Sequence, residues 1–567
     1  MNILGISCFY HNSAACVVQD GKVITAASEE RFNRQKNSPV FPINAINFCI
    51  QNANLTIYDI DYIGFYEKPF LKFYRVLLSH LRAYPFSFKN FLDTIPSWLE
   101  ERLIIPLVLK KELGYDGKVL FIKHHLSHAA STFLVSPFEE AAILTADGLG
   151  EWSTMSFGIG KGKDIKIIKE MHFPNSLGLF YTAVTTYLGF EALRGEGKVM
   201  GLAGYGEPCY VNKFKEMITV KADGSFMINQ NFFGFNKGSR MYGSRMYSNR
   251  LIKTLGKDRK PDDKIEQRHY DIATSLQKFT EDTLITIANN LYNETKLDKL
   301  CLAGGLFLNC VVNSKILENT PFKEIFVQPD AGDSGGALGV ASYIYHSILG
   351  NNRNYVMNDA YLGPDFSSNQ MKRALLNNGI AFKELEDAEL FKYIAKQISQ
   401  NKIIGWFQGR MEFGPRALGN RSILANPCNP DMKDLLNSKV KKREYFRPYA
   451  PAVLEERTSE FFEIKQLSPF MLLAARVRED KRPIIPAVTH VDGTARVQTV
   501  SKNTNPKFWH LIKEFENITG VPILINTSFN LRGEPIVCTP EDAISCFKRS
   551  QMDCLVLGNY VVEKIQT

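Results

Sequence analysis

One pattern of strands occurs twice in this chain, and it limits the folds that the sequence can adopt. Residues 2–7 and 13–19 are expected to form strands joined by a polar loop, and an Asp-Gly pair then predicts a tight hairpin into a third strand over 22–28. The same order of strand, loop, strand, turn and strand recurs over residues 141–171. Helical sequence follows each copy. We therefore expect an α/β fold whose first part has two pseudo-symmetric halves with a cleft between them.

The chain is long enough to require more than one core. A length of 567 residues exceeds what one hydrophobic core usually supports. A polar stretch near residues 350–354 has few anchoring side chains and marks a boundary, which divides the chain into domains 1–352 and 353–567. Alternating elements beyond it, from a helix at 391–400 to a strand at 521–525, predict a second α/β domain.

The composition excludes several classes of protein. A hydrophobic content of 45% and a charged content of 22% are typical of a globular protein. The first residues do not resemble a secretory signal, and charges and prolines interrupt the most apolar segment, residues 70–111. We interpret that segment as amphipathic helices under a lid or in a subunit contact, which leaves a homodimer open. The 10 cysteines contain no Cys-x-x-Cys pair. We expect a cytoplasmic protein without a membrane partner.

A net charge of +9 fits a nucleic acid or a small anionic substrate equally well, so the positions of the charges decide. One basic cluster, residues 439–447, indicates an anion pocket, and nucleic acid is therefore the less favoured partner. The other basic stretch, residues 237–264, contains a doubled five-residue segment rich in glycine and serine. We interpret it as a mobile loop whose role is solvation.

Two histidines predict a metal site. His124 and His128 lie four residues apart, so a helix would place both imidazoles on one face. This spacing alone fits a metal pair or an ordinary helix start equally well. Asp147 follows a buried strand and Asp333 lies in a glycine-rich turn, and two histidines with two carboxylates suit iron, manganese or zinc. The glutamate that follows the first histidine of metalloproteases is absent, which does not support hydrolysis by that mechanism.

Glycine turns and arginine loops predict sites for phosphates. A strand runs into a glycine turn at 303–309, where the backbone could approach a ligand closely. In the second half, arginines stand among glycines and polar residues in four loops, over 408–422, 443–447, 492–496 and 526–534. Arginine offers paired donors that suit phosphate, so together the loops predict a polyanion pocket. The chain contains neither a Walker loop nor a Gly-x-Ser-x-Gly elbow.

At these motifs the chain resembles the carbamoyltransferases of the nodulation-protein U and antibiotic O-carbamoyltransferase family. The resemblance covers nearly the whole chain and is weak only at 70–111 and 237–264. The motifs that carry it lie at residues 5–15, 28–36, 124–131, 197–206, 303–309, 414–422, 443–448 and 526–530.

The resemblance implies an N-terminal domain with the duplicated fold of the actin-like ATPase superfamily, similar to the tRNA threonylcarbamoyl-transfer enzyme. It implies a YrdC-like C-terminal α/β domain. The C-terminal domain would convert carbamoyl phosphate and ATP, supplied with Mg²⁺, into carbamoyl-adenylate. The N-terminal domain would then pass the carbamoyl group to a hydroxyl of a small-molecule acceptor, as in the biosynthesis of natural products, sugars or toxins.

The resemblance also implies roles for individual residues. The metal, Fe²⁺ first with Mn²⁺ or Zn²⁺ as alternatives, would be held by the two histidines and two aspartates named above. His11 is the candidate base that would accept the proton of the acceptor hydroxyl. The alternative is that His11 only forms hydrogen bonds within its loop. Lys36 would act near the adenylate. The nucleotide would be lined by Lys36, Gly148, Gly304, Gly305 and Asn309. Carbamoyl phosphate would be bound by Arg416, Lys441, Arg447, Arg496, Asn526 and Ser528.

Two other functions of the same chemistry remain open. A tRNA-modifying enzyme that uses threonylcarbamoyl-adenylate would bind tRNA with a steep dependence on salt. A carbamoyltransferase of hydrogenase maturation would be expected to carry Cys-x-x-Cys zinc modules, which this chain lacks. The identity of the acceptor does not follow from the sequence.

Overall fold

The chain forms two compact units in a computed structural model that describes residues 1–85, 87–234 and 245–564. The first unit consists of Met1–Thr25 and Pro39–Val356, and the second of Ala26–Ser38 and Met357–Thr567. The roles assigned to domains 1–352 and 353–567 remain predictions. That an early segment, Ala26–Ser38, belongs to the second unit was not expected from the sequence.

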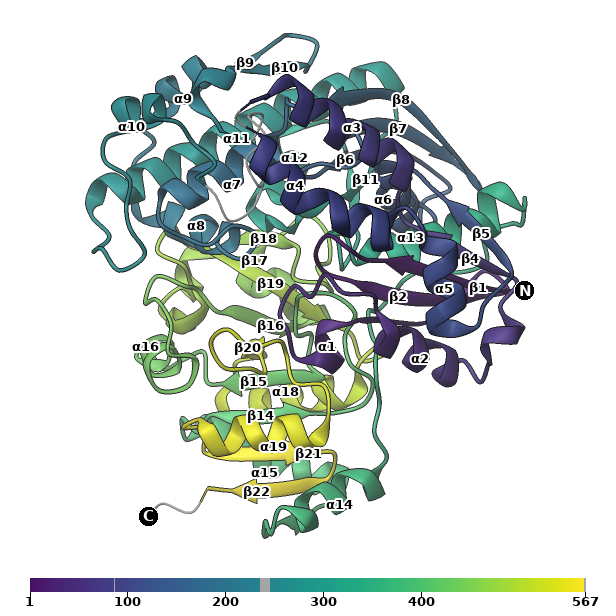
Figure 1. Cartoon of the computed structure of the whole chain (residues 1–567). Coiled ribbons are helices and arrows are strands. Elements are labelled where there is room, and N and C mark those ends of the chain that lie inside the picture. Colours follow the sequence, from purple (N-terminus) through teal and green to yellow (C-terminus); the bar gives the residue numbers. More distant parts are fainter. Residues whose placement is uncertain (86, 235–244, 565–567) are drawn as a thin grey trace. The chain divides into compact units, whose positions relative to one another are not determined.

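The repeated strand pattern forms two five-stranded sheets with the same topology (Figure 1). Their strand orders are β3-β2-β1-β4-β5 and β8-β7-β6-β11-β12. In both sheets the central strand pairs antiparallel with its hairpin partner and parallel with the strand on its other side. The prediction of two similar halves is therefore confirmed for the strand pattern. The strands are β1 Asn2–Ser7, β2 Ala14–Gln19, β3 Lys22–Ser28, β4 Tyr62–Phe65, β5 Lys118–Phe121, β6 Glu140–Ala146, β7 Ser153–Lys161, β8 Asp164–His172, β11 Lys299–Ala303 and β12 Glu324–Val327.

Two helices pack closely in the core of this unit. Helix α13 contacts α6 and the strands β1 and β2. A Cβ atom added at Gly339 would lie 1.9 Å from the carbonyl oxygen of Ser127, so only glycine allows the two helices to approach this closely. The helices of the unit are α2 Ile43–Asn52, α3 Pro69–Arg82, α4 Phe88–Ser97, α5 Ile105–Leu113, α6 His124–Phe133, α7 Leu177–Tyr187, α8 Glu196–Leu202, α9 Val211–Met217, α10 Asn249–Leu255, α11 Gln267–Thr295, α12 Cys310–Asn319 and α13 Gly335–Tyr343, and a short hairpin joins β9 Ile218–Val220 to β10 Phe226–Ile228.

The two segments of weakest resemblance differ in outcome. The described residues of 70–111 contain α3, α4 and α5, so the prediction of helices is confirmed there, and their role in a lid or a subunit contact stays a prediction. Part of the predicted loop 237–264 lies outside the described residues. The remainder contains α10, so the prediction of a loop is wrong at Asn249–Leu255. Tyr247 is only 8% exposed, and its hydroxyl donates to Asp258 Oδ2 at 2.7 Å. Among the described residues, no helix combines the length and the apolar character needed to cross a membrane.

The second unit is built on one mixed sheet of ten strands, in the order β13-β22-β21-β14-β15-β20-β16-β19-β18-β17. Helices α15 and α18 pack against each other, and its apolar core includes Trp406 and Phe529. The strands are β13 Lys383–Glu384, β14 Ile404–Phe407, β15 Arg421–Ala425, β16 Ala450–Leu454, β17 Phe462–Glu463, β18 Leu473–Val477, β19 Thr494–Val500, β20 Ile523–Ser528, β21 Cys554–Leu557 and β22 Tyr560–Glu563. The helices are α1 Glu30–Asn33, α14 Ser368–Asn377, α15 Asp387–Ser399, α16 Met432–Leu435, α17 Thr458–Phe461, α18 Pro506–Thr519 and α19 Pro540–Arg549.

Candidate active site

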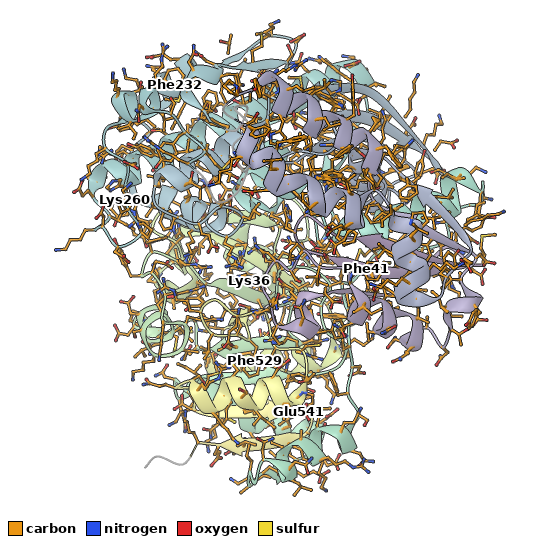
Figure 2. The ribbon with its side chains drawn as sticks, in the orientation of Figure 1. Lys36, Phe41, Phe232, Lys260, Phe529 and Glu541 are labelled. Carbon is orange, nitrogen blue, oxygen red and sulfur yellow. The ribbon has the colours of Figure 1, made fainter. Side chains whose placement is uncertain are left out.

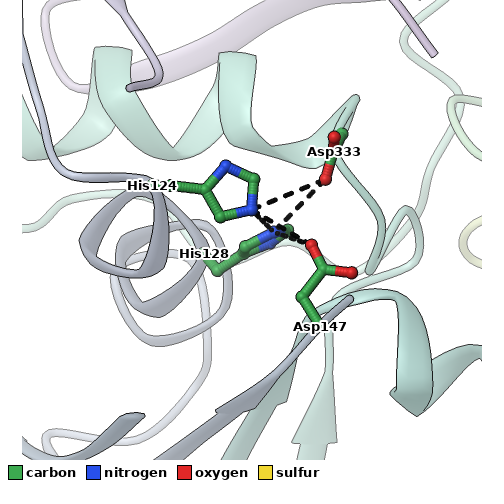
Figure 3. A group of neighbouring side chains, drawn as sticks. All are labelled: His124, His128, Asp147 and Asp333. Atoms are coloured by element: carbon green, nitrogen blue, oxygen red, sulfur yellow. Dashed lines mark hydrogen bonds and ion pairs between the residues drawn. The ribbon is translucent and has the colours of Figure 1, made fainter. Parts of the chain in front are cut away.

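The four residues predicted to bind a metal lie together in the first unit (Figure 3). Single ligand atoms of His124, His128, Asp147 and Asp333 all lie within 4.8 Å of one another. The Nε2 atoms of the two histidines are 3.1 Å apart, and both face Asp147 Oδ2, at 3.0 and 3.2 Å. Asp333 Oδ1 lies 3.6 and 3.7 Å from the same two nitrogens. The arrangement therefore offers two nitrogen and two oxygen ligands to one cation.

Local structure explains why these four side chains converge. The helix α6 begins at His124, so both histidines lie on its first turns, and Asp147 follows the last residue of β6. Asp333 lies two residues before α13, the helix that packs closely on α6. The start of α6 is anchored by Glu151, whose carboxylate accepts a hydrogen bond from the backbone N–H of His124 at 3.0 Å.

The electrostatics of the cluster fit a bound cation. Burial disfavours a charged imidazole, but the neighbouring carboxylates of Asp147 and Asp333 outweigh that effect and raise the pKa of His128 to about 9. Burial would raise the pKa of Asp147, yet hydrogen bonds from the two histidines hold that pKa well below its usual value. Both carboxylate oxygens of Asp333 are buried and accept no hydrogen bond from the described residues. A buried carboxylate without donors is costly, and a metal ion would satisfy it.

His11 lies beside this cluster. Its Nε2 is 3.6 Å from Asp333 Oδ2, and its side chain remains 14% exposed. Its ring packs 4.8 Å from that of Tyr10. The neighbouring His125 does not join the cluster, because its Nδ1 is within 2.7 Å of Thr145 Oγ1. Among the histidines discussed, His11 therefore combines proximity to the cluster with access to solvent.

The predicted nucleotide glycines lie next to the metal cluster. Gly304 adopts a φ of 104°, and an added Cβ would lie 2.2 Å from the carbonyl oxygen of Ala146. A Cβ at Gly305 would approach Asp147 Oδ1 at 3.0 Å, and the backbone N–H of Gly148 donates to the same oxygen at 2.7 Å. The glycine turn therefore brings bare backbone to the edge of the cluster, where a phosphate could approach it.

Asn309, also predicted to bind nucleotide, has structural partners. Its side-chain oxygen accepts from the backbone N–H of Val312 at 3.2 Å and so caps α12. Its side-chain nitrogen donates to Gln277 Oε1 at 2.9 Å. Helix capping accounts for an asparagine at this position, so its role in nucleotide binding stays a prediction.

The cations predicted to bind carbamoyl phosphate form a cluster in the second unit. Lys441 is 3% exposed, and its Nζ donates to Asn530 Oδ1 at 2.7 Å and to Ser528 Oγ at 3.3 Å. Burial nevertheless lowers the pKa of Lys441 well below its usual value, and the charges of Arg443, Arg447 and Lys36 lower it further. Burial, with Arg443 as the next cause, lowers the pKa of Arg447 to about 10. Buried cations that repel one another favour the binding of an anion.

The remaining predicted residues of this pocket lie on adjacent strands or in a nearby loop. Asn526 in β20 donates to Gln498 Oε1 at 2.7 Å, and Arg496 lies two residues before Gln498 in β19, on the same face of the sheet. The charge of Arg496 also contributes to the lowered pKa of Arg447. Asn526 further donates to the carbonyl oxygen of Ala417, the residue after Arg416, at 3.2 Å. The structure thus brings the six predicted residues into one region of the second unit.

The unit to which Lys36 belongs was not expected from the sequence. It belongs to the second unit (Figure 2), whereas the other residues predicted to bind nucleotide belong to the first. Its neighbours Arg31 and Arg34 anchor the segment, with Arg31 Nη2 donating to Gly414 O at 2.8 Å and Arg34 Nη2 donating to Pro535 O at 3.0 Å.

Sequence reasoning missed two residues with clear roles in these sites. Glu151 anchors the backbone of His124, and Arg443 contributes to the charge of the second cluster. Arg443 lies in the basic cluster 439–447, so the charge of that cluster was a usable signal. Glu151 lies 27 residues from His124 in the sequence, so no local sequence pattern predicts their contact.

Comparison with known proteins identifies relatives over the whole length. The profile "Carbamoyltransferase N-terminus" matches residues 2–342 and "Carbamoyltransferase C-terminus" matches residues 395–564. An uncharacterized protein of Synechocystis sp., sll1178, is 44% identical over 99% of this chain and 97% of its own length. Nodulation protein NolNO of Sinorhizobium fredii is 38% identical over 98% of this chain and 79% of its own. Nodulation protein U of the same species is 28% identical over 96% of both chains.

Proposed function

Because this chain belongs to the carbamoyltransferase family, it is a transferase, and we propose that it uses ATP to move a carbamoyl group from carbamoyl phosphate to a hydroxyl of a small-molecule acceptor. The observation that carries this proposal is the presence of two chemically different clusters, one in each unit. The first offers nitrogen and oxygen ligands to a metal, and the second offers buried cations to an anion. Two clusters of this kind suit a reaction in two steps.

The second unit would carry the first step. Lys441, Arg447 and Arg496 would neutralise the phosphate of carbamoyl phosphate, and Arg416 would add a paired donor from its loop. Water would cleave carbamoyl phosphate into carbamate and phosphate. A carbamate oxygen would then attack the α-phosphorus of ATP, which would form carbamoyl-adenylate and displace pyrophosphate. The lowered pKa values of Lys441 and Arg447 support this assignment, because a bound anion would offset the burial and the repulsion between cations that lower them. Lys36, in the same unit, would serve the same adenylate.

The first unit would carry the transfer step. Its two histidines and two aspartates would hold the divalent metal, with iron(II) preferred over manganese and zinc. When bound, the metal would supply Lewis-acid polarisation of a carbonyl oxygen. His11 would accept the proton of the acceptor hydroxyl at its imidazole, since it lies beside the cluster and is partly exposed. The glycine turn at Gly304 and Gly305 would admit the adenylate close to the backbone, and AMP would leave.

The fold is consistent with this division of labour. The repeated five-stranded topology of the first unit supports its assignment to the actin-like ATPase superfamily. We propose a YrdC-like role for the second unit because its mixed sheet of ten strands carries the cluster of buried cations.

Pyrophosphate release tests the proposal. Purified protein with ATP and Mg²⁺ should release pyrophosphate only when carbamoyl phosphate is added. Arg416→Ala and Arg447→Ala should each reduce that release by about tenfold to a hundredfold, because each removes a charge-assisted contact. Arg373→Ala is the matched control, since Arg373 is an exposed arginine of the same unit that lies in α14, outside the four arginine loops. Carbamoyl-phosphate-independent release, or full release by both variants, would contradict the assignment.

A further inference from the structure

The loop that carries Arg416 is buried almost throughout. Of the residues 411–421, only Pro415 and Arg416 are not buried. The loop lies between β14 and β15 and is covered by side chains of β19 and β20, including Gln498, which donates to Leu418 O at 2.8 Å. The chain is therefore held on both sides of a tip that presents one arginine.

One carboxylate organises this loop from inside. Glu412 is 3% exposed, and its Oε1 accepts hydrogen bonds from three backbone N–H groups. The donors are those of Leu418 at 2.6 Å, Asn420 at 2.9 Å and Arg421 at 3.3 Å. These bonds close the loop across the tip, because Glu412 precedes Arg416 and its three donors follow it. The geometry resembles a helix cap, in which a side-chain acceptor replaces missing backbone partners.

The charge of Glu412 also has a counterpart. Arg421 is fully buried, and its guanidinium donates to carbonyl oxygens, among them Gly409 at 3.0 Å and Pro364 at 2.9 Å. It also lies 3.6 Å from the centre of the Phe407 ring. Burial lowers the pKa of Arg421 to about 10, and the negative charge of Glu412 is the strongest effect in the opposite direction. The two charges thus compensate each other while their hydrogen bonds go to the backbone.

We infer that Glu412 is a positioning residue for the anion pocket: its carboxylate holds the loop closed so that Arg416 faces carbamoyl phosphate. The inference rests on the proposed function of Arg416. We assign Glu412 no direct contact with the substrate, because its side chain is buried and its Oε1 is occupied by three backbone donors. Its Oε2 is also buried and has no hydrogen-bond partner among the described residues. Its effect should therefore appear in the binding of carbamoyl phosphate and not in the binding of ATP.

Steady-state pyrophosphate release by the full-length enzyme tests this inference. Glu412→Ala should raise the KM for carbamoyl phosphate by about tenfold or more, with the KM for ATP and kcat retained. Glu412→Gln keeps an acceptor oxygen of the same reach, so it should restore most of that loss although it lacks the charge. If Glu412→Ala does not fold, Glu412→Asp replaces it, since the shorter side chain moves the acceptor away from the three donors.

The controls separate this inference from the proposed function. Glu516→Gln alters another buried carboxylate of the second unit, which is bonded to Lys513 at 2.7 Å, and should leave all three constants unchanged. If Arg416→Ala loses activity while Glu412→Ala and Glu412→Asp keep the wild-type KM for carbamoyl phosphate, the inference about Glu412 is wrong and the pocket stands. An equal rise in both KM values, or a Gln variant as impaired as the Ala variant, would also overturn it. A wild-type protein without carbamoyl-phosphate-dependent release would instead contradict the proposed function.

Discussion

Two buried charge clusters show how single residues depend on their surroundings. The pKa of His128 is raised and that of Lys441 is lowered, although both side chains are buried. The difference lies in their neighbours, which are carboxylates around His128 and further cations around Lys441. A metal would replace the proton of the first cluster, and an anion would stabilise the charge of the second.

The first prediction concerns the metal ligand His128. His128→Ala should weaken metal binding by about 100-fold or more, since it removes a ligand where loss of an outer partner alone costs 10–100-fold. Metal content by elemental analysis and affinity by titration measure this. His125→Gln is the matched control, because His125 lies on the same helix and is bonded to Thr145 outside the cluster. Equal metal content in wild type and His128→Ala would remove His128 from the ligand set.

The second prediction concerns Lys441 and pH. The pKa of Lys441 in the folded protein lies below the ordinary lysine value of about 10.4, which applies to the unfolded chain. At a pH between these two pKa values, Lys441 is protonated in the unfolded chain but not in the folded protein. Lys441 therefore makes the free energy of unfolding rise with pH across that window, and its unfavourable contribution is complete below the folded pKa. Bound phosphate should raise the pKa again, so binding above the folded pKa should take up a proton.

Calorimetric titration of phosphate in two buffers of different ionisation enthalpy measures that uptake. Lys441→Met should bind phosphate more weakly and without the proton that wild type takes up at the same pH. Identical proton uptake in the two proteins would show that another group titrates.

At the scale of elements, helix α3 has an unusual distribution of side chains. Its cations Lys72 and Arg75 are only 3% and 5% exposed, whereas Phe70 and Tyr74 are 72% and 57% exposed. The buried face is held by an ion pair between Lys72 and Glu67 and by the Tyr10 ring, 4.6 Å from Lys72 Nζ. Because Tyr10 precedes His11, α3 packs against the loop that carries the candidate base.

The third prediction concerns this helix and the acceptor. Exchanging the exposed residues of α3 for those of a relative should change which acceptor is carbamoylated, since α3 lies against the loop of His11 and is the part of weak family resemblance. Acceptor-independent pyrophosphate release should remain unchanged, because that step is assigned to the other unit. Product analysis with a panel of hydroxylated acceptors measures the change. Retention of the parental preference would favour a role for α3 in a subunit contact instead.

The elements that the sequence predicted have local patterns. The hairpin of β2 and β3 follows from an Asp-Gly turn between two largely apolar strands. The helix α10 was missed, because it stands in a polar, glycine-containing stretch where loop signals outweigh seven helical residues.

At the scale of the whole molecule, the two candidate sites belong to different units of the chain. The steps assigned to them should therefore fail independently. The Ala26–Ser38 segment is the exception to a simple division, since it interrupts the first unit and brings Lys36 into the second.

The fourth prediction uses metal removal to separate the steps. Protein treated with a strong chelator, then returned to buffer with ATP and Mg²⁺, should keep carbamoyl-phosphate-dependent pyrophosphate release and lose the carbamoylated product. Adding back Fe²⁺, Mn²⁺ or Zn²⁺ should restore the product, and the best of the three identifies the preferred metal. Loss of both activities on chelation, with both regained on addition of the same ion, would place the metal in the first step.

The sequence alone determined the repeated strand pattern, the family and the residue types of both candidate sites. Its local signals were enough there, since hairpins, helical spacing and glycine turns depend on neighbours along the chain. The tertiary structure then brought Asp333 to within 3.6 Å of His124, as the sequence had predicted for one metal site. Only the tertiary structure decided that Lys36 belongs to the second unit and that the Glu412 carboxylate closes the Arg416 loop. These contacts depend on the distance at which packed elements lie, as where Gly339 of α13 lies against α6. The spacing of residues along the sequence does not predict that distance.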